Sequence, residues 1–307
     1  MRIVFMGTPD FAVPCLKALI DDGNEIAAVF TQPDKPKGRG YTMTPPPVKV
    51  TALENNIEVF QPVTLRNDET LQLLQKLEPE MIVVVAYGKI LPKEIIDLPQ
   101  YGCVNIHASL LPLYRGAAPI QQAVLDGCAV TGVTAQCMDV GIDTGDILMK
   151  TETPIGENET ADELHDRLSL LGAELIVKVV HAAAEGTLTR EKQDESKATH
   201  VGKLTKEMSV IDFSKSAQHI HNQVRGLNSW PSASAVLNGK RVKIHRTIIA
   251  EGSGEPGQVL SLIPFIVACG EGAVEITELQ PEGKKKMDAR AFINGLHGIT
   301  ADELKFS

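Results

Sequence analysis

Three side chains that can work on a carbonyl group stand next to two turns of this sequence. Asn105 and His107 lie in the run Asn-Ile-His-Ala-Ser-Leu-Leu-Pro, and Asp143 opens the run Asp-Thr-Gly-Asp after a second apolar stretch. An imidazole exchanges protons near neutral pH, a nearby carboxylate favours its protonated form, and an Asn amide donates to a developing oxyanion. These residue types predict acyl transfer without a nucleophilic Ser or Cys.

The alternative for His107 is a structural role, in which its ring caps the end of a strand through a backbone hydrogen bond. However, Ser-Leu-Leu-Pro after His107 and Asp-Thr-Gly-Asp from Asp143 are both tight turns just past apolar runs. Such a pair of turns favours a reactive site over a simple cap.

The elements expected around these residues place the site at the edge of a sheet. If a strand ends at His107, Asn105 and His107 share one face and Ile106 points into the core, because successive side chains alternate. Short apolar runs predict parallel strands covered on both faces, at residues 3–6, 26–30, 81–86 and 104–107. Periodic segments predict helices between them, at residues 11–20, 48–53, 68–77 with Asp68 as N-cap, and 120–125. This alternation predicts a doubly wound, mostly parallel, Rossmann-like α/β sheet, whose sites lie beyond the carboxyl ends of its strands.

The last third of the chain has a different pattern. Thr160 and Glu163 form a capping box for a helix over residues 160–185. Polar residues without a clear period follow, and then come a helix over 216–227 and strand-like runs around the hairpin signal Asn238-Gly239. The strand-like runs predict a small β-barrel of the oligonucleotide-binding type, at residues 234–237, 241–249, 258–262, 265–269 and 273–279. We expect a catalytic domain over residues 1–187, a linker over 188–208 and a C-terminal barrel domain over 209–307.

Length and composition agree with two domains of a cytoplasmic protein. The chain has 307 residues, a hydrophobic content of 43% and a net charge of -9. The charge is uneven, because residues 204–307 hold twelve Lys and Arg against eleven Asp and Glu, so the excess of acid lies in the rest of the chain. The N-terminus is predicted to be a strand and not a signal peptide. Five widely spaced cysteines predict reduced thiols, not disulfides or a metal site: Cys15, Cys103, Cys128, Cys137 and Cys269.

Further motifs join the first two and together resemble the methionyl-tRNA formyltransferases, which are folate-dependent formyltransferases. The resemblance covers nearly the whole chain and is highly specific as a set. The motifs that carry it, besides Asn-Ile-His-Ala-Ser-Leu-Leu-Pro, are Gly7-Thr8-Pro9-Asp10, Gln32-Pro33-Asp34-Lys35, Val84-Val85-Ala86-Tyr87-Gly88, Tyr114-Arg115-Gly116-Ala117-Ala118-Pro119-Ile120-Gln121, Met138-Asp139-Val140-Gly141-Ile142-Asp143-Thr144-Gly145-Asp146, Ile211-Asp212-Phe213 and Asn228-Ser229-Trp230-Pro231.

The resemblance implies a reaction and the residues that perform it. It implies that a formyl group moves from 10-formyltetrahydrofolate to the free α-amine of methionyl initiator tRNA, for translation initiation, with Asn105, His107 and Asp143 as catalytic residues. The turn after the strand is implied to line the tetrahydrofolate site, through Ser109, Leu110, Leu111 and Pro112. Direct attack by the amine needs neither a covalent enzyme intermediate nor a metal.

The basic loop over residues 35–44 has two interpretations. Its composition alone equally fits a solvated surface loop. The resemblance implies that it contacts the acceptor end of the tRNA, with Arg39 as the chief contact and Lys35 and Lys37 beside it, and cations that neutralise phosphates are sufficient for this. A second basic group at Lys284, Lys285, Lys286 and the hairpin over residues 240–246 is either a further backbone contact or a solvated hairpin end.

Alternatives within the same chemistry are the glycinamide ribonucleotide formyltransferases and the sugar-nucleotide formyltransferases. The former usually lack a C-terminal β domain, and the latter are expected to differ after Leu-Leu-Pro. A folate-binding or RNA-binding module without catalysis is the alternative from another class, and the complete Asn, His and Asp set disfavours it. Gln122 and His200 depart from the common pattern, outside the catalytic residues. Nothing in the sequence requires more than a monomer.

Overall fold

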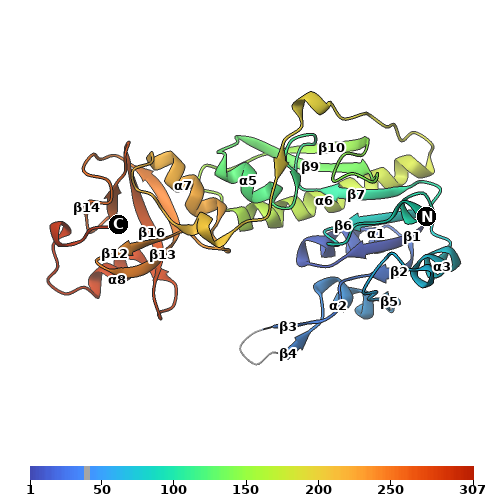
Figure 1. The fold of residues 1–307 in the computed structure, drawn as a ribbon, viewed down its shortest axis with the longest axis horizontal. Coiled ribbons are helices and arrows are strands. Elements are labelled where there is room, and N and C mark those ends of the chain that lie inside the picture. The colour runs from blue at the N-terminus through green and yellow to red at the C-terminus, as the bar shows by residue number, and fades with distance from the viewer. Residues whose placement is uncertain (38–41) are drawn as a thin grey trace. The chain divides into compact units, whose positions relative to one another are not determined.

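The computed structural model describes residues 1–37 and 42–307, and the chain forms two compact units (Figure 1). The first unit comprises Met1–Gly116, Thr131–Thr153 and His165–Val201. The second comprises Ala117–Val130, Pro154–Leu164 and Gly202–Ser307. Neither unit is one continuous stretch of sequence. None of the helices in the described ranges has the length and apolar character needed to span a membrane.

A seven-stranded sheet forms the centre of the first unit, in the order β10-β9-β7-β6-β1-β2-β5. Its strands are β1 (Arg2–Gly7), β2 (Glu25–Phe30), β5 (Val59–Phe60), β6 (Met81–Val85), β7 (Cys103–His107), β9 (Val130–Cys137) and β10 (Ile147–Pro154). The pairs β1/β2, β1/β6, β2/β5 and β6/β7 are parallel, whereas β7/β9 is antiparallel. The predicted doubly wound, mostly parallel sheet is therefore confirmed.

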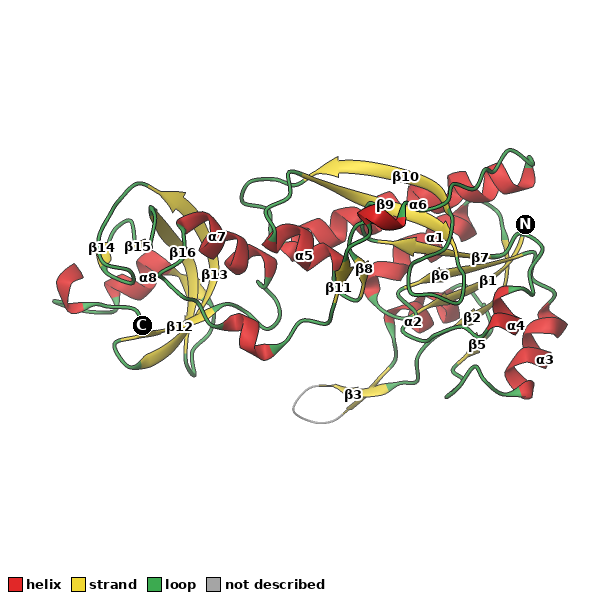
Figure 2. Cartoon of the chain, turned by 45° about the horizontal axis from the view of Figure 1, so that its top comes forward, coloured by secondary structure: helices red, strands yellow, loops and turns green. Residues whose placement is uncertain are grey.

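Helices cover both faces of this sheet, which is why its central strands are apolar throughout (Figure 2). The helices α3 (Asp68–Leu77) and α4 (Lys93–Ile96) share a core with β1, β2 and β6. On the opposite face, Gly172 of α6 (Ala161–Ala184) lies against Ile106 of β7 and Cys15 of α1 (Val13–Asp21). A further helix, α2 (Pro47–Glu54), follows the hairpin of β3 (Lys35–Lys37) and β4 (Thr42–Thr44).

The capping predictions had mixed outcomes. The capping box of α6 is confirmed, because the Thr160 N–H donates to Glu163 Oε2 at 2.9 Å and the Glu163 N–H donates to Thr160 Oγ1 at 3.3 Å. The N-cap of α3 was predicted one residue too late. Asn67 is the cap and accepts from the Thr70 N–H, while Asp68 is the first helical residue. Both residue types make good caps, and Asp68 still favours the helix start through its charge.

The second unit is built around an antiparallel sheet in the order β12-β13-β16-β15-β14, with β17 also paired to β16. Its elements are β12 (Ser234–Leu237), β13 (Lys240–Ala250), β14 (Val259–Ser261), β15 (Ile266–Ala268), β16 (Ala273–Pro281), β17 (Met287–Asp288), α5 (Pro119–Leu125), α7 (Ala217–Gly226) and α8 (Ala289–Asn294). Asn238 and Gly239 both have positive φ in the turn between β12 and β13, as predicted for this hairpin. The curved antiparallel sheet agrees with the predicted small barrel.

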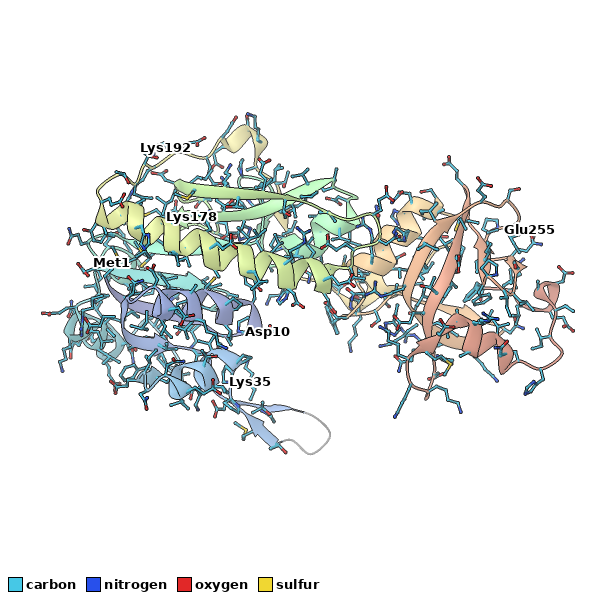
Figure 3. All side chains as sticks on the ribbon, turned by 180° about the vertical axis from the view of Figure 1, so that it is seen from behind. Met1, Asp10, Lys35, Lys178, Lys192 and Glu255 are labelled. Atoms are coloured by element: carbon cyan, nitrogen blue, oxygen red, sulfur yellow. The ribbon has the colours of Figure 1, made fainter. Side chains whose placement is uncertain are left out.

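The polar segment after α6 contains short elements of its own. They are η2 (Glu195–Lys197), β11 (His200–Val201) and η3 (Lys206–Ser209). β11 pairs in parallel with β8 (Arg115–Gly116), so this stretch contacts the chain just beyond the Asn-Ile-His strand. Figure 3 labels Lys192 on the same segment, where its side chain is 90% exposed.

Candidate functional site

Strand pairing places the polar residues of β7 and β9 side by side. Asn105 lies opposite Gln136, and His107 lies opposite Thr134. Directly opposed residues of neighbouring strands share one face of a sheet. Ile106, between the two β7 residues, faces α6 on the other side. The end of β7 therefore presents an amide and an imidazole together, as the alternation of side chains predicted.

Asp143 joins them from the loop between β9 and β10. Its Oδ1 accepts from Gln136 Nε2 at 2.8 Å and lies 3.5 Å from Asn105 Nδ2, and its Oδ2 accepts from the Gly116 N–H at 2.9 Å. Asp143 has a φ of 56°, in the left-handed region that a non-glycine residue rarely adopts. The structure therefore brings the three residues of the first prediction together around one carboxylate.

The His107 ring lies between two acceptor groups. Nε2 lies 2.9 Å from the Tyr114 carbonyl oxygen, and Nδ1 lies 3.5 Å from Asp143 Oδ1. Both partners are acceptors, so the ring can donate towards either of them. The side chains of His107 and Asp143 are 7% and 15% exposed, which strengthens their attraction relative to a solvated pair. The arrangement therefore holds the ring in a fixed orientation.

Hydrogen bonds from its own residues and from Thr134 of β9 fix the turn from Ser109 to Pro112. Ser109 Oγ donates to the Leu113 carbonyl at 2.6 Å. Thr134 Oγ1 donates to the Ser109 carbonyl at 2.6 Å and accepts from the Leu111 N–H at 3.1 Å. Ser109 and Leu111 are fully buried, whereas Leu110 and Pro112 retain exposed surface. Only the latter two side chains can touch a ligand in this conformation.

Behind these residues lies a second layer to which the sequence assigns no role. Arg115 is 1% exposed and forms a two-pronged ion pair with Glu195, at 2.9 and 2.6 Å. This pairing raises the pKa of Arg115 and lowers the pKa of the Glu195 carboxyl. Arg115 also donates to Oε1 of Gln193 from Nε and Nη2. Of this layer, Arg115 belongs to one of the motifs that carry the resemblance, and Gln136 is a buried polar residue of β9. Gln193 and Glu195 lie about 80 residues from Arg115 in the sequence, and no local pattern indicates that they belong to the site.

The neighbouring strand ends form part of the same sheet edge. The Tyr87 carbonyl, just beyond β6, accepts from Thr8 Oγ1 at 3.0 Å and from Gln32 Nε2 at 3.1 Å. Burial raises the pKa of the Tyr87 phenol to about 12. A cavity of about 350 Å³ adjoins these loops, and its lining includes Gln32, Arg66 and Lys89.

The basic loop is described only in part. Lys35 is exposed on β3, where Figure 3 labels it. Lys37 ends the same strand, and Arg39 lies outside the described residues. Lys49 Nζ binds Asp34 at 2.8 Å just before β3, and this contact lowers the pKa of the Asp34 carboxyl. The root of the hairpin is therefore anchored to α2.

Family models match both halves of the chain. The model described as formyl transferase matches residues 1–180, and the model described as formyl transferase, C-terminal domain, matches residues 203–297. The chain belongs to the formyl transferase family.

Individual relatives refine this class. A methionyl-tRNA formyltransferase of Citrifermentans bemidjiense is 51% identical over 96% of this chain and 93% of its own length. Those of Geobacter sulfurreducens and Clostridium novyi are 48% and 49% identical, again over 96% of this chain, and 94% and 97% of their own lengths are covered. The resemblance to methionyl-tRNA formyltransferases is thus confirmed over nearly the full length of both partners.

Solved structures share the fold at lower identity. The sugar 3N-formyl transferase WlaRD superposes with a TM-score of 0.69 at 22% identity, covering 93% of this chain and 99% of its own. HypX from Aquifex aeolicus, solved with tetrahydrofolic acid, gives a TM-score of 0.65 at 18% identity and covers 97% of this chain. This chain spans about half the length of HypX, 48%. These two likenesses concern the fold alone.

Proposed function

We propose that this protein transfers the formyl group of 10-formyltetrahydrofolate to the free α-amine of methionyl initiator tRNA, giving N-formylmethionyl-tRNA for translation initiation in the cytoplasm. The observation that carries the proposal is the convergence of Asn105, His107 and Asp143 at the end of β7. It occurs in a chain 51% identical to a methionyl-tRNA formyltransferase.

The reaction is a direct acyl transfer. The amine nitrogen attacks the formyl carbon, the bond from that carbon to folate N10 breaks, the amine loses a proton and N10 gains one. Charge develops on the formyl oxygen during the attack, and the Asn105 amide and the His107 imidazolium are the donors that stabilise it. Asp143 holds Nδ1 of His107, so that Nε2–H is the group for which the substrate competes with the Tyr114 carbonyl.

The folate co-substrate is placed by the turn that follows β7. Leu110 and Pro112 supply the exposed apolar contacts, and the buried Ser109 and Leu111 give the turn its shape. The cavity beside Tyr87 lies at the same carboxyl edge of the sheet, where ligands of such folds bind. Its volume, about 350 Å³, is at the lower end of the range for small-molecule sites.

The tRNA is bound through cations outside this pocket. Lys35 and Lys37 of β3, together with Arg39, which lies outside the described residues, neutralise phosphates of the acceptor end. Replacement of Arg39 by Ala is expected to raise the KM for the tRNA while folate binding, followed by fluorescence titration, stays unchanged. An equal loss of folate binding would refute the role of Arg39.

An acceptor panel tests the proposed function directly. The protein is offered labelled 10-formyltetrahydrofolate with charged initiator tRNA, charged elongator tRNA, glycinamide ribonucleotide or an amino-sugar nucleotide. Label is expected in the initiator methionyl-tRNA. Preferential formylation of either small molecule would overturn the assignment of initiator tRNA as the acceptor. The comparison is worthwhile because HypX and WlaRD share this fold.

The catalytic assignment is tested at His107. His107→Ala is expected to lower kcat by about 10²- to 10⁴-fold, the usual contribution of a general acid or base. His181→Ala is the matched control, since His181 lies in the same unit and pairs with Asp22 at 2.9 Å on the surface. Unchanged transfer by a folded His107→Ala protein would rule out catalysis by this residue.

A further inference from the structure

Residues 193–201, which we call the strap, run past both loops that contact His107. One loop carries Asp143 and the other carries Tyr114. The strap belongs to the first unit, and its last residues form β11 beside β8 (Figure 2). Its sequence is polar and carries no recognisable motif.

At one end of the strap, a single side chain holds the loop of Asp143. Gln193 Nε2 donates to the carbonyl oxygens of Asp143 at 2.8 Å and Gly145 at 2.7 Å. Asp143 needs such support, because its backbone has a positive φ that is unfavourable for a residue with a side chain. Both hydrogens of one amide therefore act on the backbone that aims the carboxylate.

The orientation of this amide is itself determined. Gln193 Oε1 accepts from Arg115 Nε at 3.1 Å and Nη2 at 2.9 Å. A guanidinium only donates, so the oxygen must face Arg115 and the NH₂ group must face the two carbonyls. Glu195 fixes Arg115 in turn through its two-pronged pair.

At the other end of the strap, Thr199 holds the loop of Tyr114. Thr199 Oγ1 accepts from the Tyr114 N–H at 2.7 Å, and its carbonyl accepts from the Arg115 N–H at 2.9 Å. The Thr199 N–H donates to the Pro112 carbonyl at 3.2 Å. The carbonyl of Tyr114 is the acceptor for Nε2 of His107.

We propose that Gln193, oriented by Arg115, and Thr199 are positioning residues for the transfer reaction. They fix the two acceptors between which the His107 ring is held: the carboxylate of Asp143 on Nδ1 and the carbonyl of Tyr114 on Nε2. The inference rests on the proposed function, because it assigns these residues to the step that His107 assists. It also gives the polar segment after α6 a task beyond connecting two units.

The test uses a matched pair of glutamines in the intact protein. Gln193→Glu keeps the shape and the contact with Arg115 but replaces both N–H donors by an oxygen. Gln223→Glu is the control, because Gln223 Nε2 likewise donates to two backbone carbonyls, those of Met208 and Val210, both at 2.9 Å, in the second unit. Thr199→Val, an exposed and nearly isosteric change, is the variant for the other end.

The first readout is independent of substrate. The Gly116 N–H donates to Asp143 Oδ2, so its hydrogen exchange reports whether the carboxylate is held. We expect at least tenfold faster exchange at Gly116 in Gln193→Glu and the wild-type rate in Gln223→Glu. Unchanged exchange in Gln193→Glu, or equal acceleration in both variants, would overturn the inference whether or not the protein transfers formyl groups.

The second readout is kinetic. Gln193→Glu is expected to lower kcat about 10- to 100-fold, the range typical for groups that orient a reacting side chain, with both KM values within about twofold of wild type. Thr199→Val is expected to lower kcat in the same way by a smaller factor. A kcat equal to that of wild type in Gln193→Glu, or a change confined to KM, contradicts a positioning role. A wild-type protein inactive with every acceptor would overturn only the proposed function, since the exchange result stands alone.

Discussion

Each of the two units contains a buried arginine and a glutamine that donates to two backbone carbonyls, yet only in the first unit do they meet at a candidate site. Arg115 binds Gln193, and Gln193 binds the loop of Asp143. In the second unit, Gln223 holds residues 208–210, and Arg225 is bound separately. Burial of polar groups alone therefore does not mark a site, whereas their convergence on one reactive group does.

The two arginines also differ in charge balance. Arg115 is neutralised by a carboxylate, and this pairing raises its pKa. Arg225, 5% exposed, is held by Asn222 Oδ1 and by the carbonyls of Gly156 and Glu159, and burial lowers its pKa. The first arrangement ties a remote segment to the site, while the second satisfies the backbone of one loop.

The largest expected contrast comes from one substitution made in each unit. A Cβ on Gly116 would lie 2.2 Å from the Val201 carbonyl oxygen, and its φ of 118° disfavours other residues. Gly239, with a φ of 77°, has no neighbour within 4 Å of that position. Gly116→Ala is expected to lower the free energy of unfolding by about 3 kcal/mol and to abolish most transfer activity. Gly239→Ala is expected to cost about 1 kcal/mol and to leave kcat unchanged. Urea unfolding and the transfer assay measure both, and equal losses of activity would contradict the contrast.

Replacing each arginine by Met gives the next largest contrast. Arg115→Met leaves Oε1 of Gln193 without its donor, and Arg225→Met removes one donor from each of the Gly156 and Glu159 carbonyls. Each change is expected to cost about 1 to 3 kcal/mol of stability. Only Arg115→Met is expected to lower kcat as well, at least tenfold. If Arg225→Met lowers kcat to the same extent in folded protein, the two arginines do not differ in function.

The ion pair of Glu163 and Arg246 in the second unit should make a small, pH-dependent contribution to stability. Arg246 lowers the pKa of the Glu163 carboxyl to about 2, and the Thr160 N–H adds to this. The folded-state pKa lies below the unfolded one, so the pair stabilises fully above about pH 4.5 and loses this contribution as pH falls towards 2. The stability difference between wild type and Glu163→Gln should therefore shrink over that window, with transfer activity at neutral pH unaffected. Because both side chains are more than 40% exposed, we expect a difference below 1 kcal/mol even at neutral pH. A difference that grows on acidification would contradict the sign.

Most of the fold could be predicted because its signals are local. Apolar runs too short for helices, such as those of β1 and β6, indicate strands covered on both faces, and the structure has them there. The Asn-Gly turn and the Thr160 capping box are equally local. The prediction of Asp68 as an N-cap is wrong because Asn67 beside it is as good a cap, and only backbone geometry distinguishes them.

The candidate site could be predicted only where its signals are local in the sequence. Asn105 and His107 share a strand, and their common face follows from its alternation. Gln193 has no such local signal. Its partners Asp143 and Arg115 are about 50 and 80 residues away, and the sequence around it has no periodicity. The support for Asp143 is a property of tertiary packing, which a single sequence does not display.

The discontinuous make-up of the second unit limits how this enzyme could have been assembled from modules. Helix α5 packs against α7, where a Cβ on Gly226 would lie 2.9 Å from Leu125 Cγ. Because α5 precedes β9 and α7 follows the strap, recombination at any one point in between would separate these two helices. A barrel exchanged between relatives at such a crossover must bring a surface that fits the α5 of the recipient, or leave that helix without its partner.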